Sequence, residues 1–245
     1  MPVPQNITGQ PMIGFSDPKT FFFGYSPSYL YDIAGLGWSM DEEPTFKTLA
    51  QMTQGGREVM NALYQNPLHN WKLKWNFLEN ELPRSLNPSV DTDFRVLYSF
   101  YCSMIGGYQE FLYEPRESAV TNQPLSTPDA NGYVELVYNL GPFFAESVQE
   151  LNGATPTIFV EYGGSIGTVN ITSTCTFYSA ASVAPYDGIV FSNASAFAPS
   201  IYSGQPIIAD FNFFYRCHFT KDALSFEEFM YKLQKTGIEI KQVRI

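Results

Sequence analysis

The chain has 245 residues, of which 44% are apolar and 16% aromatic, and its formal net charge is −10. Disordered chains are poor in aromatic residues and rich in charge, so this composition excludes a disordered chain and predicts a substantial folded core. The acidic balance does not favour a protein that binds DNA, RNA or an anionic membrane.

The N-terminal region lacks the basic flank and apolar core of a signal peptide, and no apolar run reaches the roughly 18 residues that a membrane helix needs. We therefore expect a chain that folds in a cytoplasm and does not insert into a membrane. Residues 1–43 are dense in Pro, Gly and aromatic residues and are expected to form an extended N-terminal arm. Cys102, Cys175 and Cys217 are too widely spaced for a disulfide framework and are expected to be buried thiols.

Strands and a helix are expected in the next segment, residues 44–116. Gly55 and Gly56 mark a turn, and residues 71–77 alternate apolar with polar side chains at the period of a half-buried strand. Helical spacing of the apolar residues then predicts a helix near residues 93–105, with Gly106-Gly107 as its stop.

Charge is distributed unevenly along the chain. Residues 117–215 contain eight acidic residues and no Lys, Arg or His. We interpret this change of composition as an acidic, β-rich insertion at residues 117–205. The strands expected in this block lie near residues 133–138, 157–162, 168–177 and 188–191.

The C-terminal segment, residues 206–245, is expected to rejoin the first β segment in one core. Ser225 and Glu228 have the S-x-x-E spacing of a capping box, which predicts a second helix near residues 226–235. Strict alternation over residues 238–245 predicts a final strand. The expected fold class is therefore mainly β with two helices (α+β).

A serine hydrolase motif is present in the acidic block. Residues 163–167 match the G-x-S-x-G pattern around Ser165. The partners would be Asp187 or Asp210 and then His218, in the chain order of α/β-hydrolases. The residues after the motif are rich in β-branched side chains and favour a strand, whereas a nucleophilic serine of this class needs a strand-to-helix turn. We therefore interpret the motif as a hairpin turn and expect no catalytic residue and no enzyme activity.

No group of residues has the spacing of a metal or cofactor site. Cys217 and His218 are adjacent, so along a strand they would point to opposite faces. Two pairs of carboxylates suggest acid–base chemistry, but we expect Glu42-Glu43 in a loop and Glu227-Glu228 at the capped start of a helix. The sequence contains no GxGxxG or Walker-type phosphate loop, and we expect no cofactor.

The aromatic surplus has two interpretations. Aromatic residues near both ends of the chain suit a core or an interface between protomers, whereas aromatic residues on loops can also stack on sugars. An interaction protein and a glycan-binding module therefore both remain open.

Three stretches of the chain resemble one family of phage proteins. The first comprises Pro44-Thr45-Phe46-Lys47-Thr48, Gln54-Gly55-Gly56-Arg57-Glu58 and Trp71-Lys72-Leu73-Lys74-Trp75. The second is Phe94 to Tyr113, followed by Glu114-Pro115-Arg116. The third begins with Phe214-Tyr215-Arg216-Cys217-His218-Phe219-Thr220-Lys221-Asp222 and continues through Phe226–Leu233 to the final strand. Their order and spacing resemble the phage minor tail protein family that includes the distal tail proteins of gene transfer agents.

The resemblance covers residues 44–245 and implies a distal tail adaptor. It implies a β-sandwich or split barrel of the tail-ring type, in which the first stretch builds a hexameric ring between the tail tube and the hub and fibres. The implied location is the tail tip of a virion that assembles in the cytoplasm of a bacterial host. DNA would pass through the lumen without specific binding. The alternative function is a receptor- or glycan-binding module at the tail tip, which uses loops of the acidic block to bind host-surface glycans.

Overall fold

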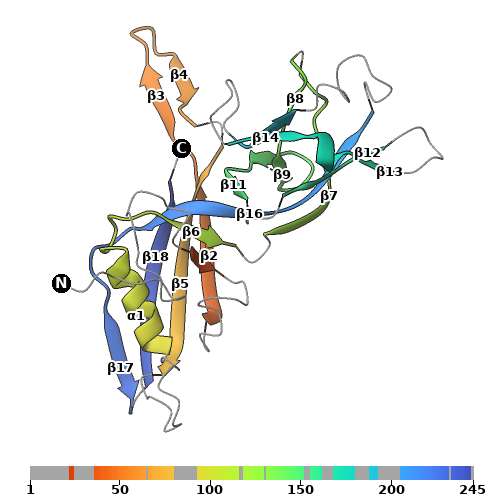
Figure 1. The fold of residues 1–245 in the computed structure, drawn as a ribbon. Coiled ribbons are helices and arrows are strands. Elements are labelled where there is room, and N and C mark those ends of the chain that lie inside the picture. The colour runs from red at the N-terminus through yellow and green to blue at the C-terminus, as the bar shows by residue number, and fades with distance from the viewer. Residues whose placement is uncertain are drawn as a thin grey trace. The chain divides into compact units, whose positions relative to one another are not determined.

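The computed structural model describes residues 22–24, 36–64, 66–79, 93–115, 118–129, 131–151, 155–161, 168–179, 188–192, 205–231 and 233–243. The fold is mainly β, as the sequence predicted, with one α-helix in this part of the chain (Figure 1). The chain divides into two compact units: the first combines Met1–Glu114 with Arg216–Arg244, and the second is Pro115–Tyr215. None of the sheets in the described residues closes into a barrel.

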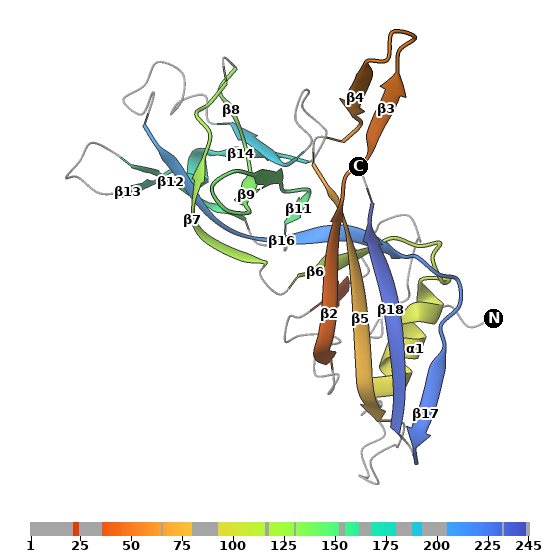
Figure 2. The ribbon, with the colours of Figure 1, turned by 180° about the vertical axis from the view of Figure 1, so that it is seen from behind.

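The first unit is built on a long, mostly antiparallel sheet. Its strand order is β1-β6-β16-β18-β5-β2, and β17 also pairs with β18. The β1–β6 pair is parallel, whereas the β16–β18, β17–β18, β18–β5 and β2–β5 pairs are antiparallel. Figure 2 shows β2, β5 and β18 side by side. The strands are β1 (Phe22–Gly24), β2 (Leu36–Thr45), β5 (Leu68–Glu79), β6 (Phe111–Glu114), β16 (Ile207–Phe219), β17 (Phe226–Met230) and β18 (Leu233–Gln242). A separate hairpin is formed by β3 (Thr48–Met52) and β4 (Glu58–Ala62).

The alternation predicted for residues 71–77 is confirmed in β5. Trp71, Leu73 and Trp75 are each at most 2% exposed, whereas the intervening lysines face solvent. Leu73 lies opposite Ile238 of β18 in register, so two buried rows meet on one face of the sheet. Burial of these large side chains is the main stabilising contribution to the unit.

The predicted first helix is confirmed as α1 (Asp93–Ser103). Its inner face buries Leu97, Phe100 and Tyr101, and the Phe100 and Tyr101 rings lie 6.0 and 5.0 Å from the Phe219 ring between centroids. Cys102 lies on the outer face of this helix and is exposed, and Cys175 is only partly buried, so the prediction of three buried thiols is wrong for these two residues. The prediction is confirmed for Cys217, which is buried. This burial raises the pKa of the Cys217 thiol.

A pair of glycines joins α1 to the rest of the unit. Gly106 has a φ of +62°, and the Gly107 N–H donates to Asp222 Oδ1 at 3.0 Å. The Tyr101 hydroxyl donates to the Lys221 carbonyl at 2.9 Å, so two hydrogen bonds hold the end of the helix against the loop after β16. The glycine stop predicted from the sequence is therefore confirmed.

The second predicted helix, near residues 226–235, is wrong. Residues Phe226–Met230 form β17 and residues from Leu233 onward form β18, in a hairpin with Glu227 opposite Lys235. The Ser225 carbonyl accepts a hydrogen bond from Thr236 Oγ1 at 2.7 Å. A bulge between Glu228 and Met230 shifts the register of the pair. Five residues are too few to distinguish helical spacing from a bulged strand.

The second unit is arranged around the N-terminal part of β16, which pairs with β7, β11 and β12. A three-stranded sheet of order β14-β15-β8 and a β9–β10 hairpin complete it. Its core includes Val134, Leu136, Ile158, Val190 and Phe191, which are all fully buried. The elements are β7 (Ala119–Leu125), β8 (Tyr133–Glu135), β9 (Val137–Asn139), β10 (Ala145–Ser147), β11 (Glu150–Leu151), β12 (Thr157–Glu161), β13 (Thr168–Asn170), the short 3-10 helix η3 (Thr172–Thr174), β14 (Thr176–Tyr178) and β15 (Val190–Ser192).

Candidate interaction surface

The β3–β4 hairpin projects from the end of the main sheet of the first unit (Figure 1). Its strands pair antiparallel, with Ala50 opposite Met60. The turn is closed by the Thr53 N–H, which donates to the Arg57 carbonyl at 2.8 Å, and by the Arg57 N–H, which donates to Thr53 Oγ1 at 3.2 Å. Gly56 adopts a φ of +74° in this turn, a backbone conformation that favours glycine.

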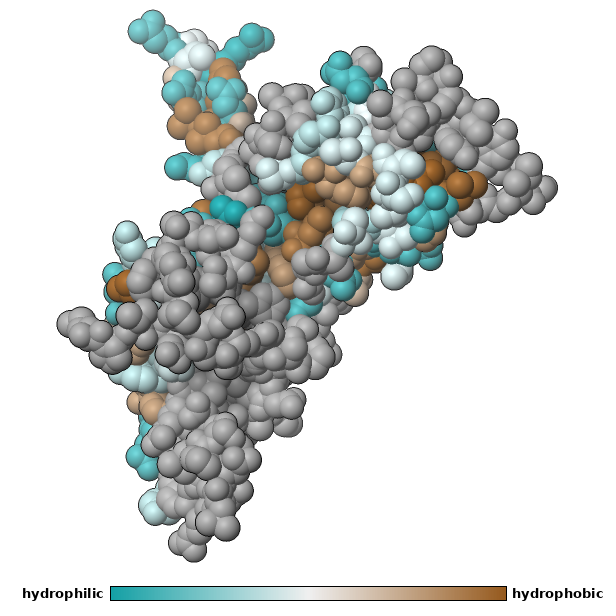
Figure 3. Space-filling model, in the orientation of Figure 1, coloured by the Kyte–Doolittle hydropathy of each residue, from teal (hydrophilic) through white to brown (hydrophobic). Residues whose placement is uncertain are grey.

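Every residue of the two hairpin strands is exposed to solvent. Within the part of the chain that the structure describes, β3 and β4 pair only with each other. Large apolar side chains nevertheless line the hairpin, and Met52 is 79% exposed and Met60 67%. Figure 3 shows apolar residues in brown on this hairpin, at the upper left. The exposed large apolar residues of the hairpin and its base are Phe46, Leu49, Met52, Val59, Met60 and Leu63.

The strand register assigns these side chains to faces. Residues directly opposite each other in an antiparallel pair point to the same face, and the face alternates along each strand. One face therefore carries Thr48, Ala50, Met52, Glu58, Met60 and Ala62, and we call it the methionine face. The other face carries Leu49, Gln51, Val59 and Asn61.

The composition of this hairpin indicates a surface that binds another molecule. An isolated two-stranded hairpin is at best marginally stable in water, and contiguous exposed apolar surface marks interaction sites. Methionine side chains suit such sites because they are flexible and polarizable. The hairpin is therefore the candidate interaction surface of the first unit.

The main sheet of the first unit also has three edge strands. In the described residues, β1 pairs only with β6, β2 only with β5 and β17 only with β18. Edge strands present backbone groups that can pair with another chain, and charged side chains limit unspecific pairing. Such charges occur at the β2 edge, where Lys72 contacts Glu43 at 3.3 Å and Lys74 contacts Asp41 at 3.6 Å.

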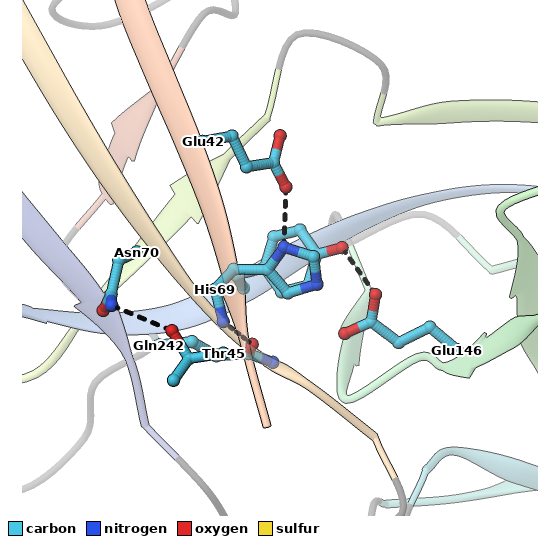
Figure 4. A network of polar contacts seen from close by, with 7 residues as sticks. Glu42, Thr45, His69, Asn70, Glu146 and Gln242 are labelled. Carbon is cyan, nitrogen blue, oxygen red and sulfur yellow. Dashed lines mark hydrogen bonds and ion pairs between the residues drawn. The ribbon is translucent and has the colours of Figure 1, made fainter. Parts of the chain in front are cut away.

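A polar network that includes the buried His69 lies on the opposite face of these strands (Figure 4). His69 Nδ1 lies 2.6 Å from Glu42 Oε1, and the His69 backbone N–H donates to Gln242 Oε1 at 3.0 Å. The hydrogen bond with His69 holds the pKa of the Glu42 carboxyl below its ordinary value of 4.5, although partial burial opposes this shift. The His69 ring stacks on Trp71 with 5.4 Å between centroids.

This network connects strands and is poorly placed for catalysis. A carboxylate and an imidazole can act together in acid–base chemistry only if a substrate reaches the ring. His69 is 3% exposed, so its ring is closed to a substrate. His69 has no recognisable sequence signal, because only the pairing of β2 with β5 brings it to Glu42.

The hydrolase motif is flanked by a hairpin. Ser165 and Asp187 lie outside the described residues. The strands on either side of the motif, β12 and β13, pair antiparallel with Glu161 opposite Thr168. This pairing agrees with the predicted hairpin and not with a strand-to-helix turn.

The remaining hydrolase candidates lie in different units and have other partners. Asp210 accepts a hydrogen bond from the Asn122 N–H at 2.7 Å within the second unit. His218 belongs to the first unit and lies opposite Lys241 of β18.

The other candidate pairs are strand residues. Cys217 is buried and His218 only half-buried on β16, which confirms that they point to opposite faces. The prediction of a loop at Glu42-Glu43 is wrong, because both residues belong to β2. The helix start predicted at Glu227-Glu228 is also wrong, because they belong to β17. Alternation in a strand separates the members of each pair.

Within the described residues, no three His, Cys, Asp or Glu side chains are grouped as they would be around a metal ion. The helix found in the same residues lacks the length and hydropathy to span a membrane. A comparison with models of known protein families finds no match, and a search of curated proteins finds none either.

Proposed function

We propose that this chain is a structural virion protein, a distal tail adaptor that forms a hexameric ring between the tail tube and the hub and fibres of a phage tail tip. The observation that carries the proposal is the β3–β4 hairpin, which bears large apolar side chains and is exposed along both strands. Such a hairpin gains stability when a partner covers it. The first stretch of the family resemblance falls on this hairpin and on β5.

The sheet of the first unit supports a ring of the tail-ring type, with a β-sandwich or split barrel as its core and the second unit as the β-rich insertion. Two of its edge strands, β2 and β17, differ in sequence, so an edge-to-edge contact between them in neighbouring protomers is heterologous. Repetition of one heterologous contact closes a ring when the rotation allows it. Roughly 1,600 Å² buried between each pair of protomers would be a standard interface.

The acidic composition of the second unit suits a lumen that DNA crosses. Residues 117–215 carry eight acidic side chains and no basic one, so they repel a phosphate backbone. Reversal of several of these charges should slow DNA ejection from assembled virions. Unchanged ejection kinetics would contradict this role for the charge.

The proposal is tested by charging the methionine face. The double variant Met52→Asp, Met60→Asp should reduce self-association, because a carboxylate buried without a partner opposes docking. The matched control is Gln51→Asp, which adds charge to the other face of the same hairpin. Light scattering across a concentration series measures the mass of each protein. Equal association by the double variant, the control and the wild type would contradict a role for this face.

One observation favours the alternative, a receptor- or glycan-binding module. Phe143, in the loop between β9 and β10 of the second unit, is 98% exposed. Exposed rings on loops can stack on sugar faces. Binding to host cells or glycan arrays that is lost in Phe143→Ala, without tail partners present, would support this alternative.

A further inference from the structure

The β3–β4 hairpin is joined to the main sheet of the first unit through β2 on one side and β5 on the other. Thr45 ends β2 and lies opposite Leu68, where β5 begins, so this residue pair marks the base of the hairpin. Phe46 and Lys47 alone lead from β2 into β3. The direction in which the hairpin leaves the sheet therefore depends on how firmly the end of β2 is held to β5.

Side chains hold the end of β2 on both faces of the strand pair. On the outer face, Asn70 Nδ2 donates to Thr45 Oγ1 at 3.3 Å. On the core face, His69 Nδ1 lies 2.6 Å from Glu42 Oε1. Figure 4 shows the carboxylate and the imidazole pointing toward one another from neighbouring strands. The two contacts together attach the base of the hairpin to β5.

The ladder between β2 and β5 makes no backbone hydrogen bond at His69. This residue lies opposite Pro44, and its N–H donates to Gln242 Oε1 on the β18 side. The backbone groups of one residue in an antiparallel ladder point to the same neighbouring strand, so those of His69 point away from β2. Proline has no N–H and could not donate in any case. The Glu42–His69 contact therefore attaches β2 where the backbone does not.

One member of this contact is open to solvent and the other lies in the core. The Glu42 side chain is 44% exposed, whereas His69 is buried. A proton from solvent can therefore reach the carboxylate while the strands remain paired. An ionised carboxylate binds an imidazole more strongly than a neutral carboxyl does, because the hydrogen bond is charge-assisted. Acid that protonates both groups leaves a buried imidazolium without its counter-charge, which favours exposure of the ring to water.

Two further titratable groups face the contact from neighbouring strands of the first unit. Burial, the Cys217 thiol and the Glu42 charge raise the pKa of the Tyr113 hydroxyl on β6. Burial also raises the pKa of the Cys217 thiol on β16. Both groups are therefore neutral in acid and at neutral pH alike. Glu146, the other carboxylate in Figure 4, belongs to the second unit and accepts a hydrogen bond within that unit.

We propose that the Glu42–His69 contact is an acid-released clamp that fixes the base of the β3–β4 hairpin to the main sheet. While Glu42 is ionised, the end of β2 stays on β5 and the hairpin keeps one direction. In acid, the end of β2 separates from β5 and the hairpin moves about its base. The β5–β18 pair stays intact, because Trp71 and Trp75 remain buried. This inference goes beyond the proposed function, since the clamp acts within one chain.

Hydrogen exchange of the purified chain tests the clamp, with protection expressed relative to an unstructured chain at the same pH. From about pH 7 to about pH 3.5, the wild-type amides of residues 41–45 should lose about three- to fivefold in protection, the size expected for a partly exposed ion pair. The amides of residues 71–75 should keep theirs. Glu42→Gln removes the charge with little change of shape, so residues 41–45 should show the low protection at both pH values.

The matched control is Glu43→Gln, which removes a carboxylate from the opposite face of the same strand and with it the contact to Lys72. This variant should keep the acid response of the wild type. Equal protection of residues 41–45 in the wild type and in Glu42→Gln at both pH values would overturn the clamp. An acid-induced loss that spreads equally to β5 and β18 would also overturn it, because the whole sheet would then be unfolding.

Discussion

The β5 strand and the β3–β4 hairpin are neighbours in the chain and both carry large apolar side chains, yet only β5 buries them. Trp71 and Trp75 are covered by the core of the first unit, whereas Met52 and Met60 are covered by nothing that the described residues contribute. Apolar side chains in a strand therefore do not by themselves indicate which molecule covers them. An apolar face without a cover in its own chain indicates a partner.

The largest expected difference between the two regions is in stability. Trp75→Ala should lower the free energy of unfolding by about 3–5 kcal/mol, because it leaves a cavity in a site that is 1% exposed. Met52→Ala should change it by less than about 0.5 kcal/mol, because the side chain is mostly in solvent. Urea unfolding of the two monomeric variants measures both values. Similar losses in both would break the comparison.

The next largest effect is expected where α1 meets the loop after β16. A Cβ on Gly107 would lie 2.6 Å from the Phe219 carbonyl oxygen, so Gly107→Ala should cost about 1–3 kcal/mol through forced backbone movement. The matched control is Gly55→Ala in the hairpin turn, where nothing lies within 4 Å of the added atom. Thermal unfolding compares the two. Equal melting temperatures would argue against tight packing at Gly107.

A smaller effect concerns the Glu42–His69 pair and depends on pH. The pKa of Glu42 is lower in the folded state than its ordinary value of 4.5, so its contribution is fully present above about pH 4.5. It is lost as the pH falls through the folded pKa. Glu42→Gln should therefore flatten the acid side of the stability profile, by less than about 1 kcal/mol because the carboxyl is partly exposed. The control is Glu43→Gln on the opposite face, and identical profiles for both variants would contradict the assignment.

The smallest effect on global stability is expected in the hairpin turn. Gly56→Ala strains a residue with a φ of +74° and should weaken the hairpin by about 1 kcal/mol. The urea midpoint of the whole protein should not change, since the hairpin contributes nothing to the core. Hydrogen exchange should become faster only between Thr48 and Ala62. A matching shift in the urea midpoint would show that hairpin and sheet unfold together.

The elements that the sequence predicted well have strong local patterns. Residues 71–77 alternate strictly, and the helix at 93–105 combines several turns of helical spacing with a glycine stop. The second helix failed because the spacing of Phe226 and Met230 is also compatible with a bulged strand in a hairpin. Pairing with β18 decided the outcome, and pairing between distant segments cannot be derived from a local pattern.

The candidate surface was predictable only in part. The glycine turn and its flanking strands were expected from Gly55 and Gly56, but their exposure depends on the absence of a third strand from the described sheet. The Glu42–His69 contact was not predictable, because strand register joins residues that are distant in the chain.

Self-assembly is tested most directly by the mass and shape of the purified wild-type chain. Size exclusion with light scattering gives the mass, and negative-stain electron microscopy gives the shape. A hexameric ring should appear as a particle of about 166 kDa, six times 27.6 kDa, with a central hole. A compact monomer of 27.6 kDa at every concentration would contradict it.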